Sequence, residues 1–149
     1  LFLDIVNPGG KPTLLGVIYR PPDTDLVLFN AELDKVLSSL AVSKTQCILA
    51  GDFNVNLLNY STCVETNNFI NLLFSYHITP QISRPTRYSD HSATLIDNIL
   101  TNQPHRNQQS GIIITDISDH LPIFYITENS NSTPKLPAKK NNISAKTVF

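Results

Sequence analysis

Carboxylate, amide and imidazole side chains follow the apolar, strand-like stretches of this sequence. Asp52 and Asn54 come directly after the apolar residues 47–50, and Asp119 and His120 come between two later apolar runs. Side chains at the ends of neighbouring strands can converge on one cleft. These residue types are the ones that metal-assisted chemistry on a phosphate ester uses.

A further carboxylate, Asp97, lies inside the apolar run of residues 95–100. Burying an unpaired charge among such neighbours costs roughly several kcal/mol of stability, so the Asp97 carboxylate needs a partner. His120 is the candidate.

Strands and helices alternate along the chain to position these groups. The apolar, β-branched segments 1–6 and 13–19 flank the turn-forming residues 7–10, which predicts an antiparallel hairpin. Apolar residues at helical spacing predict amphipathic helices over 28–42 and 65–76. Further strands are expected at 46–50, 78–82, 93–100, 111–115 and 121–127, with a polar loop at 84–92. This order indicates an α/β domain with helices packed on sheets.

Composition indicates one domain over residues 1–128, followed by a linker or disordered tail over 129–149 that is rich in Asn, Ser, Thr, Pro and Lys. The formal net charge of −1 is unevenly distributed: four of the 11 basic residues follow Glu128, which leaves seven against 12 acidic ones. The body is therefore acidic. Net charge does not attract it to nucleic acid, and a polyanion has to be held by local arginines or by metal ions.

The two cysteines, Cys47 and Cys63, do not indicate a disulfide, because Cys47 lies in an apolar strand and no secretory leader precedes it. No apolar run approaches the length of a membrane span. We expect an intracellular protein without a membrane partner. The first residue, Leu1, is not a methionine, which suggests that the chain begins partway through a larger reading frame.

Five short motifs together resemble the endonuclease/exonuclease/phosphatase superfamily. Their amino-acid sequences are most similar to those of the endonuclease domain of non-LTR retrotransposons. They follow the family's order and are VIYRPP (17–22), LAGDFN (49–54), RPTR (84–87), TLIDNILTN (94–102) and SDHLPI (118–123). The resemblance implies an α/β (α+β) fold of four layers, in which a two-sheet β-sandwich is flanked by helices. It also implies an active site at one end of the sandwich.

By this resemblance, Asp52 orients and activates the attacking water, and Asn54 contacts the water or the phosphate. With one residue between them in an extended segment, the two side chains can point the same way. The alternative is that the segment is an ordinary turn after a buried strand, since Gly, Asp and Asn are common turn formers.

The resemblance also assigns His120 as the phosphate ligand and transition-state stabiliser, held in orientation by Asp97, with Asp119 on the metal side. Adjacent residues on a strand face opposite ways, which suits two different roles for Asp119 and His120. The alternative is a surface turn with a cap-like Ser-Asp pair.

Tyr19 resembles the family's phosphate-contacting tyrosine; otherwise it is an ordinary aromatic residue of a strand. Arg20, Arg84, Thr86 and Arg87 are expected to contact the DNA backbone, which supplies affinity without reading sequence. A solvated loop is the alternative for residues 84–87.

Part of the family pattern is absent from this chain. Family members begin with a strand carrying an Asn and a strand ending in the principal metal-binding Glu, whereas here no glutamate precedes Glu32. We therefore expect the fold to lack its N-terminal strands, with an exposed sheet edge and apolar surface. Affinity for Mg²⁺ (or Mn²⁺) should be reduced.

Three functions are left open by these motifs. The first is metal-dependent phosphodiester hydrolysis, as a DNA endonuclease of the retrotransposon type that nicks DNA weakly, or not at all, in this form. The second is an inactive remnant or a nucleic-acid-binding module with the same fold. The third, less favoured by the wording around Asp97, is a phosphatase for a small phosphorylated substrate. The resemblance further implies DNA as partner, a reverse transcriptase domain in a longer parent chain, and a nuclear location if the target is chromosomal DNA.

Overall fold

A five-stranded sheet forms the centre of the fold in the computed structural model, which describes residues 1–5, 12–103 and 108–127. Its strands, in spatial order, are β1 (Phe2–Ile5), β2 (Thr13–Tyr19), β3 (Gln46–Asp52), β7 (Asp97–Thr101) and β4 (Thr79–Pro80). β1 and β2 form the predicted antiparallel hairpin, although its turn and the predicted tail at 129–149 lie outside the described residues. β2 and β3 are parallel, which requires a crossover connection.

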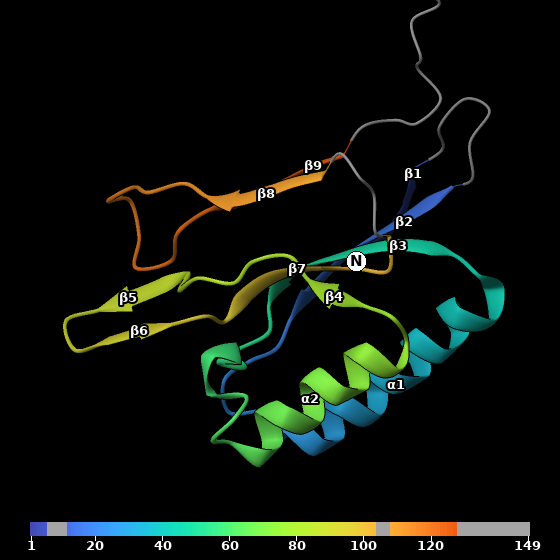
Figure 1. Cartoon of the computed structure of the whole chain (residues 1–149), viewed down its shortest axis with the longest axis horizontal. Helices are drawn as coiled ribbons and strands as arrows, with labels where there is room; N and C mark the ends of the chain where they lie inside the picture. The colour runs from blue at the N-terminus through green and yellow to red at the C-terminus, as the bar shows by residue number, and fades with distance from the viewer. Residues whose placement is uncertain (6–11, 104–107, 128–149) are drawn as a thin grey trace, which may run out of the picture.

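Helix α1 (Leu26–Ser43) makes that crossover, and α2 (Val64–Ser75) packs beside it on the same face of the sheet (Figure 1). α1 begins where the Asp25 carboxylate accepts hydrogen bonds from the first free backbone N–H groups of the helix. It ends at Lys44, which has a left-handed backbone. The helix boundaries thus follow from local hydrogen bonding.

The hydrophobic core lies between the two helices and the sheet. β3 is buried on both faces over residues 47–49, which explains its continuous apolar run. The core cluster comprises Leu33 and Leu37 of α1, Phe69 and Leu73 of α2, and Cys47, Leu49, Phe53, Val55, Ile78 and Leu100.

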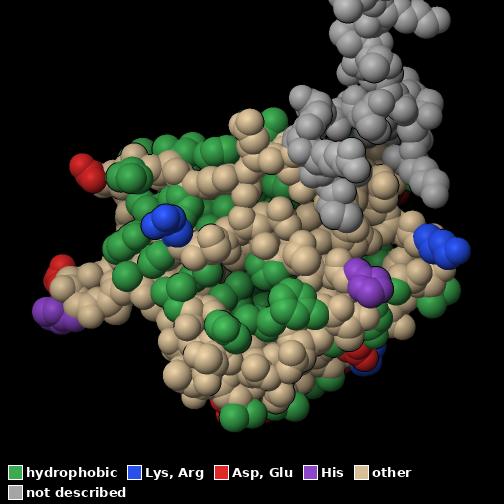
Figure 2. Space-filling model, viewed as in Figure 1, with side chains coloured by type: hydrophobic (Ala, Val, Ile, Leu, Met, Phe, Trp, Pro, Cys, Tyr) green, Lys and Arg blue, Asp and Glu red, His purple; other side chains and the backbone are tan. Residues whose placement is uncertain are grey.

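A second, two-stranded sheet of β8 (Gln108–Ile112) and β9 (Ile123–Thr127) lies over the face that the helices leave free (Figure 1). The fold is therefore α/β, with two sheets face to face and helices outside. Of the four layers that the resemblance implies, the described residues form three. The layers do not close fully: a cavity of about 370 Å³ lies between the 81–88 segment and β8, and hydrophobic side chains gather on that side of the molecule (Figure 2).

Four predicted elements differ from the structure. The predicted strand 78–82 is reduced to Thr79–Pro80, and the predicted strand 111–115 lies earlier in the chain, as β8. The predicted strand 93–100 is divided into β6 (Ser92–Thr94) and β7, and the predicted polar loop 84–92 contains β5 (Arg87–Ser89), which pairs with β6. The break has a physical cause. The backbone N–H groups of Leu95 and Ile96 donate to side-chain oxygens of Asn56 and Thr86 instead of to a neighbouring strand.

The face of β1 and β2 turned away from the helices is apolar and open. Leu3, Ile5 and Val17 are 52%, 40% and 51% exposed. Leu3 and Ile5 pair in register with Leu15 and Thr13, so these side chains share one face of the sheet. This is the exposed apolar surface expected for a sandwich that lacks strands. None of the described helices is long and apolar enough to cross a membrane.

Candidate active site

Three neighbouring strands bring a tyrosine and two carboxylates into one row. Tyr19 is in register with Asp52, and Asp52 is in register with Asp97, so the ends of β2, β3 and β7 meet at one edge. Residues in register on adjacent strands project to the same face of a sheet. The strand pairing alone therefore places these three predicted site residues side by side.

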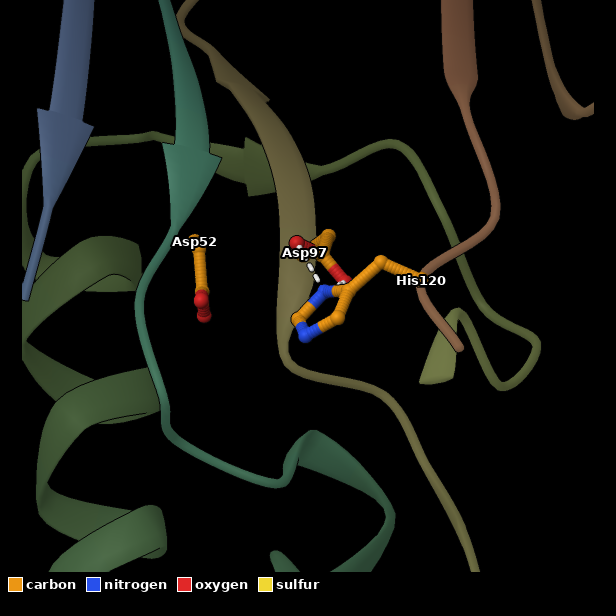
Figure 3. Close-up of side chains that lie close together, drawn as sticks. All are labelled: Asp52, Asp97 and His120. Carbon is orange, nitrogen blue, oxygen red and sulfur yellow. Dashed lines mark hydrogen bonds and ion pairs between the residues drawn. The ribbon is translucent and has the colours of Figure 1, made fainter. Parts of the chain in front are cut away.

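His120 joins this row from the segment before β9. Its Nδ1 lies 3.0 Å from Oδ2 and 3.1 Å from Oδ1 of Asp97 (Figure 3). The Asp97 side chain is 15% exposed and that of His120 is 33% exposed. The expectation that His120 is the partner of the carboxylate in the apolar run is confirmed.

Asp52 is oriented by a turn rather than by an extended segment. Its Oδ1 accepts the backbone N–H of Asn54 at 2.9 Å, and its Oδ2 accepts the Asn54 side-chain amide at 3.1 Å. Asn54 has a φ of 49°, a left-handed conformation that Asn tolerates. The prediction of parallel side chains on an extended segment is wrong in geometry. The two residues are in direct contact, and Asn54 holds the Asp52 carboxylate.

Asp52, Asp97 and His120 form a group that fits a divalent cation. One ligand atom from each residue lies within 4.8 Å of the others. The two carboxylates suit Mg²⁺ or Mn²⁺, which usually take one or two protein carboxylates and complete their shell with phosphate and water, whereas an imidazole is a ligand more typical of zinc, copper and iron. The group borders an open cavity of about 410 Å³ between the two sheets, which leaves room for such ligands.

Asp119 is turned toward an arginine instead of toward this group. Its Oδ2 lies 2.8 Å from Nε of Arg87, and both side chains are about half exposed. The hydrogen bond from Arg87 lowers the pKa of the Asp119 carboxyl, and the same contact raises the pKa of Arg87. A metal role for Asp119 stays a prediction, and it requires this carboxylate to exchange Arg87 for the cation.

Two of the predicted DNA-contacting residues are buried, which corrects their assignment. Arg20 is 5% exposed, and its guanidinium donates to the backbone carbonyls of Phe53, Thr24 and Asn54. Thr86 is fully buried, and its hydroxyl oxygen accepts two backbone N–H groups. Both side chains already have backbone partners and cannot reach a DNA phosphate in this conformation.

The remaining predicted site residues at the surface are accessible. Tyr19 is 66% exposed at the edge of the site. Arg87 is exposed but paired with Asp119, whereas Arg84 is exposed and lines the cavity beside β8. Arg84 has no ion pair among the described residues. It is therefore the predicted arginine most available to a phosphate.

Two polar residues outside the predicted site residues support the segments that carry them. The Ser118 hydroxyl accepts the backbone N–H of His120 at 3.1 Å, which fixes the turn before the imidazole. Asn98, 1% exposed, accepts the N–H groups of Gln81 and Ile82 and donates to the Ile82 carbonyl. Ser118 lies in the SDHLPI motif and Asn98 directly follows Asp97. Their positions next to predicted site residues were the sequence features that could have indicated a supporting role.

Comparison with known families gives a match that spans well over half of the chain. The sequence model of a family described as "Endonuclease-reverse transcriptase" matches residues 13–124. The matched region contains every predicted site residue. No curated protein matches the sequence.

Solved structures with a similar fold include three of low sequence identity. The endonuclease domain of TRAS1, a telomere-specific non-LTR retrotransposon, has a TM-score of 0.66 at 11% identity, over 87% of this chain and 64% of that one. An endonuclease/exonuclease/phosphatase family protein from Leptotrichia buccalis C-1013-b has a TM-score of 0.58 at 18% identity, over 83% and 52%. SmcL has a TM-score of 0.56 at 15% identity, over 85% and 57%. The chain thus spans between about half and two thirds of the structures it resembles.

Proposed function

Because this chain belongs to the endonuclease–reverse transcriptase family, a branch of the endonuclease/exonuclease/phosphatase superfamily, we propose that it hydrolyses phosphodiester bonds of DNA with a divalent metal ion. The proposed reaction is nicking of one strand, as in a retrotransposon endonuclease. The contact that carries this proposal is the Asp97–His120 pair facing Asp52 across 4.8 Å or less. A carboxylate and an oriented imidazole on opposite sides of one space suit in-line attack on a phosphate.

Each side chain has a distinct part in the proposed reaction. Asp52, held by Asn54, accepts a hydrogen bond from the attacking water and orients it toward phosphorus. Asp97 accepts the Nδ1 proton of His120, and the Nε2–H of the protonated imidazole donates to a phosphate oxygen. Tyr19, which is exposed and in register with Asp52, contacts the phosphate in this proposal. When bound, a divalent cation near Asp52 and Asp97 neutralises phosphate charge.

We expect activity to be weak. The cluster contains two carboxylates and lacks a glutamate, and the carboxylate of Asp119 is engaged by Arg87. Fewer free carboxylates bind Mg²⁺ less tightly. For the whole protein, we propose DNA as substrate, a reverse transcriptase domain in the parent chain, and action in the nucleus where the target is chromosomal DNA.

Nicking of a supercoiled plasmid tests the proposal. The purified chain should convert supercoiled to open-circular DNA in Mg²⁺ or Mn²⁺, and EDTA should abolish the conversion. Asp52→Ala and His120→Ala should remove the activity. Glu32→Ala is the matched control, because it deletes an exposed carboxylate on α1 away from the site and should change nothing.

Two other outcomes would point to the alternative functions. Folded protein that binds DNA but never nicks it would contradict the proposal and favour a non-catalytic remnant or binding module. Metal-dependent release of phosphate from a small phosphate ester, without nicking, would favour a phosphatase. Both assays use the same protein preparation, so a difference between their results cannot come from a difference in folding.

A further inference from the structure

Thr86 contacts both chain segments that carry the Asp97–His120 pair. Its hydroxyl oxygen accepts the backbone N–H of Asp97 at 3.1 Å and that of Ile96 at 3.3 Å. Its carbonyl oxygen accepts the backbone N–H of Leu121, the residue after His120, at 2.7 Å. One residue, fully buried, therefore connects the start of β7 to the segment before β9.

The residues after Thr86 extend this connection along the His120 segment. The backbone N–H of Tyr88 donates to the carbonyl of Asp119 at 2.9 Å, and Arg87 forms an isolated β-bridge with His120. His120 is thus bracketed by hydrogen bonds to its preceding and following neighbours. Both come from the same short segment, residues 86–88.

Asp97 and His120 reach the site from elements that are otherwise separate. β7 belongs to the five-stranded sheet, whereas His120 lies just before β9 of the two-stranded sheet. A cavity lies between the sheets beside them, so close packing of side chains does not fix their spacing. The hydrogen bonds of Thr86 supply a direct link.

We propose that Thr86 is a positioning residue, which sets the distance and orientation of His120 relative to Asp97 for the proposed phosphodiester hydrolysis. The expected effect of Thr86 on catalysis rests on that proposed function. Its effect on the distance and orientation of His120 relative to Asp97 rests on the hydrogen bonds alone. Thr86 acts through the backbone of both segments and touches neither substrate nor metal. The RPTR motif thereby contributes through a buried hydroxyl, with the arginines on either side at the surface.

Removal of the hydroxyl acceptor should loosen the pair without unfolding the domain. Thr86→Val keeps the shape but leaves the N–H groups of Ile96 and Asp97 without an acceptor. Thr86→Ser keeps the acceptor, and Thr86→Cys replaces it by the weaker acceptor sulfur. The Ser and Cys variants both lack the methyl group, so their difference isolates the acceptor atom.

Thr101→Val is the matched control. Thr101 is also buried, lies at the other end of β7, and has a hydroxyl that donates to the Cys47 carbonyl at 2.7 Å. Its loss should lower the melting temperature as loss of the Thr86 hydroxyl does. It should leave the Asp97–His120 pair intact.

Two measurements on the full chain test the proposal. In ¹⁵N-edited NMR, the Nδ1 proton of His120 should be protected from solvent exchange in wild type, Thr86→Ser and Thr101→Val, and lost or broadened in Thr86→Val and Thr86→Cys. In single-turnover nicking, the rate at saturating protein should fall about tenfold to a hundredfold in Thr86→Val, with DNA affinity within about twofold.

The outcomes separate this inference from the proposed function. Absence of nicking by wild type would reject the function, and the NMR signal would still decide the positioning role. An unchanged Nδ1 proton in Thr86→Cys, or equal effects in Thr86→Val and Thr101→Val, would overturn the inference. If Thr86→Val does not fold, comparison of the Nδ1 proton of His120 in Thr86→Ser and Thr86→Cys tests the inference in the same way.

Discussion

At the scale of single residues, the hydrogen bonds of Asp97 decide which imidazole nitrogen of His120 is left free. Both carboxylate oxygens lie about 3 Å from Nδ1 of His120, and a carboxylate can only accept. Nδ1 therefore carries a proton, and Nε2 is the atom directed into the space shared with Asp52 (Figure 3). Sequence reasoning could predict this pair, because a lone carboxylate inside the run 95–100 requires a partner.

Asp97→Asn should separate orientation of the imidazole from binding of DNA. The amide keeps the size of the side chain but lacks the negative charge that pairs with the protonated imidazole, whose Nε2–H donates to the phosphate in the proposed reaction. We expect the nicking rate to fall by about a hundredfold or more, with the DNA dissociation constant within about threefold. Single-turnover kinetics and fluorescence anisotropy measure the two quantities. A loss of affinity that accounts for the whole loss of rate would contradict the assignment.

The Arg87–Asp119 contact should make the fold sensitive to acid. Arg87 lowers the pKa of Asp119 in the folded chain below that of the unfolded chain. The contact therefore contributes its full stabilisation above the usual pKa range of aspartate and loses it as the pH falls through the lower folded pKa. In urea unfolding, Asp119→Asn should be less stable than wild type at pH 7, and the difference should vanish in acid. A difference that persists or grows in acid would exclude this cause.

At the scale of elements, the site depends on how closely β2 and β3 approach just before Asp52. Gly51 has a φ of 155°, and a Cβ atom there would lie 1.7 Å from the backbone oxygen of Ile18. The sequence indicated that a glycine ends the apolar run 47–50. It could not reveal that the glycine remains in the strand, because the contact arises from pairing with a segment more than thirty residues earlier.

Gly51→Ala should disrupt the end of β3 and destabilise the fold. The methyl group meets backbone, which cannot rotate away, so β2 and β3 must separate where Tyr19 pairs with Asp52. We expect a loss of at least about 3 kcal/mol in the free energy of unfolding, measured in urea. Gly111→Ala is the control: its Cβ meets only the Phe124 ring, which can shift, so we expect a loss below about 1 kcal/mol. Similar losses for both variants would contradict this account.

The features that were predicted incorrectly from the sequence depend on hydrogen bonds between distant residues. Strand β7 begins at Asp97 because side chains of Asn56 and Thr86 take the backbone donors of the two residues before it. Arg20 was expected at the DNA surface, yet it is buried among backbone carbonyls. Hydrogen bonds between residues far apart in the sequence determine these features. Such bonds cannot be predicted from the periodicity of apolar residues along the chain. The helices and the hairpin of β1 and β2 were predictable because local patterns determine them.

At the scale of the whole molecule, apolar side chains are exposed on the open face of β1 and β2. Leu3 and Ile5 of the edge strand β1 and Val17 of β2 together form an exposed apolar patch on this face. Sequence reasoning predicted this exposure from the absence of the family's first strands. It could not locate the patch, because which face of β1 is open depends on where both helices pack.

Self-association through this face is the expected consequence for the purified chain. An exposed apolar edge strand favours pairing with a second copy, so the average mass in sedimentation equilibrium should rise with concentration. Leu3→Thr combined with Ile5→Thr keeps the β-propensity of the strand and removes apolar area. This variant should associate at concentrations at least about tenfold higher, because each buried aliphatic side chain contributes about 1.5–3 kcal/mol. Val27→Thr combined with Val42→Thr is the control on α1, where two valines are 72% and 82% exposed away from this face. Equal effects of the two double variants would show that association does not depend on the open face of the sheet.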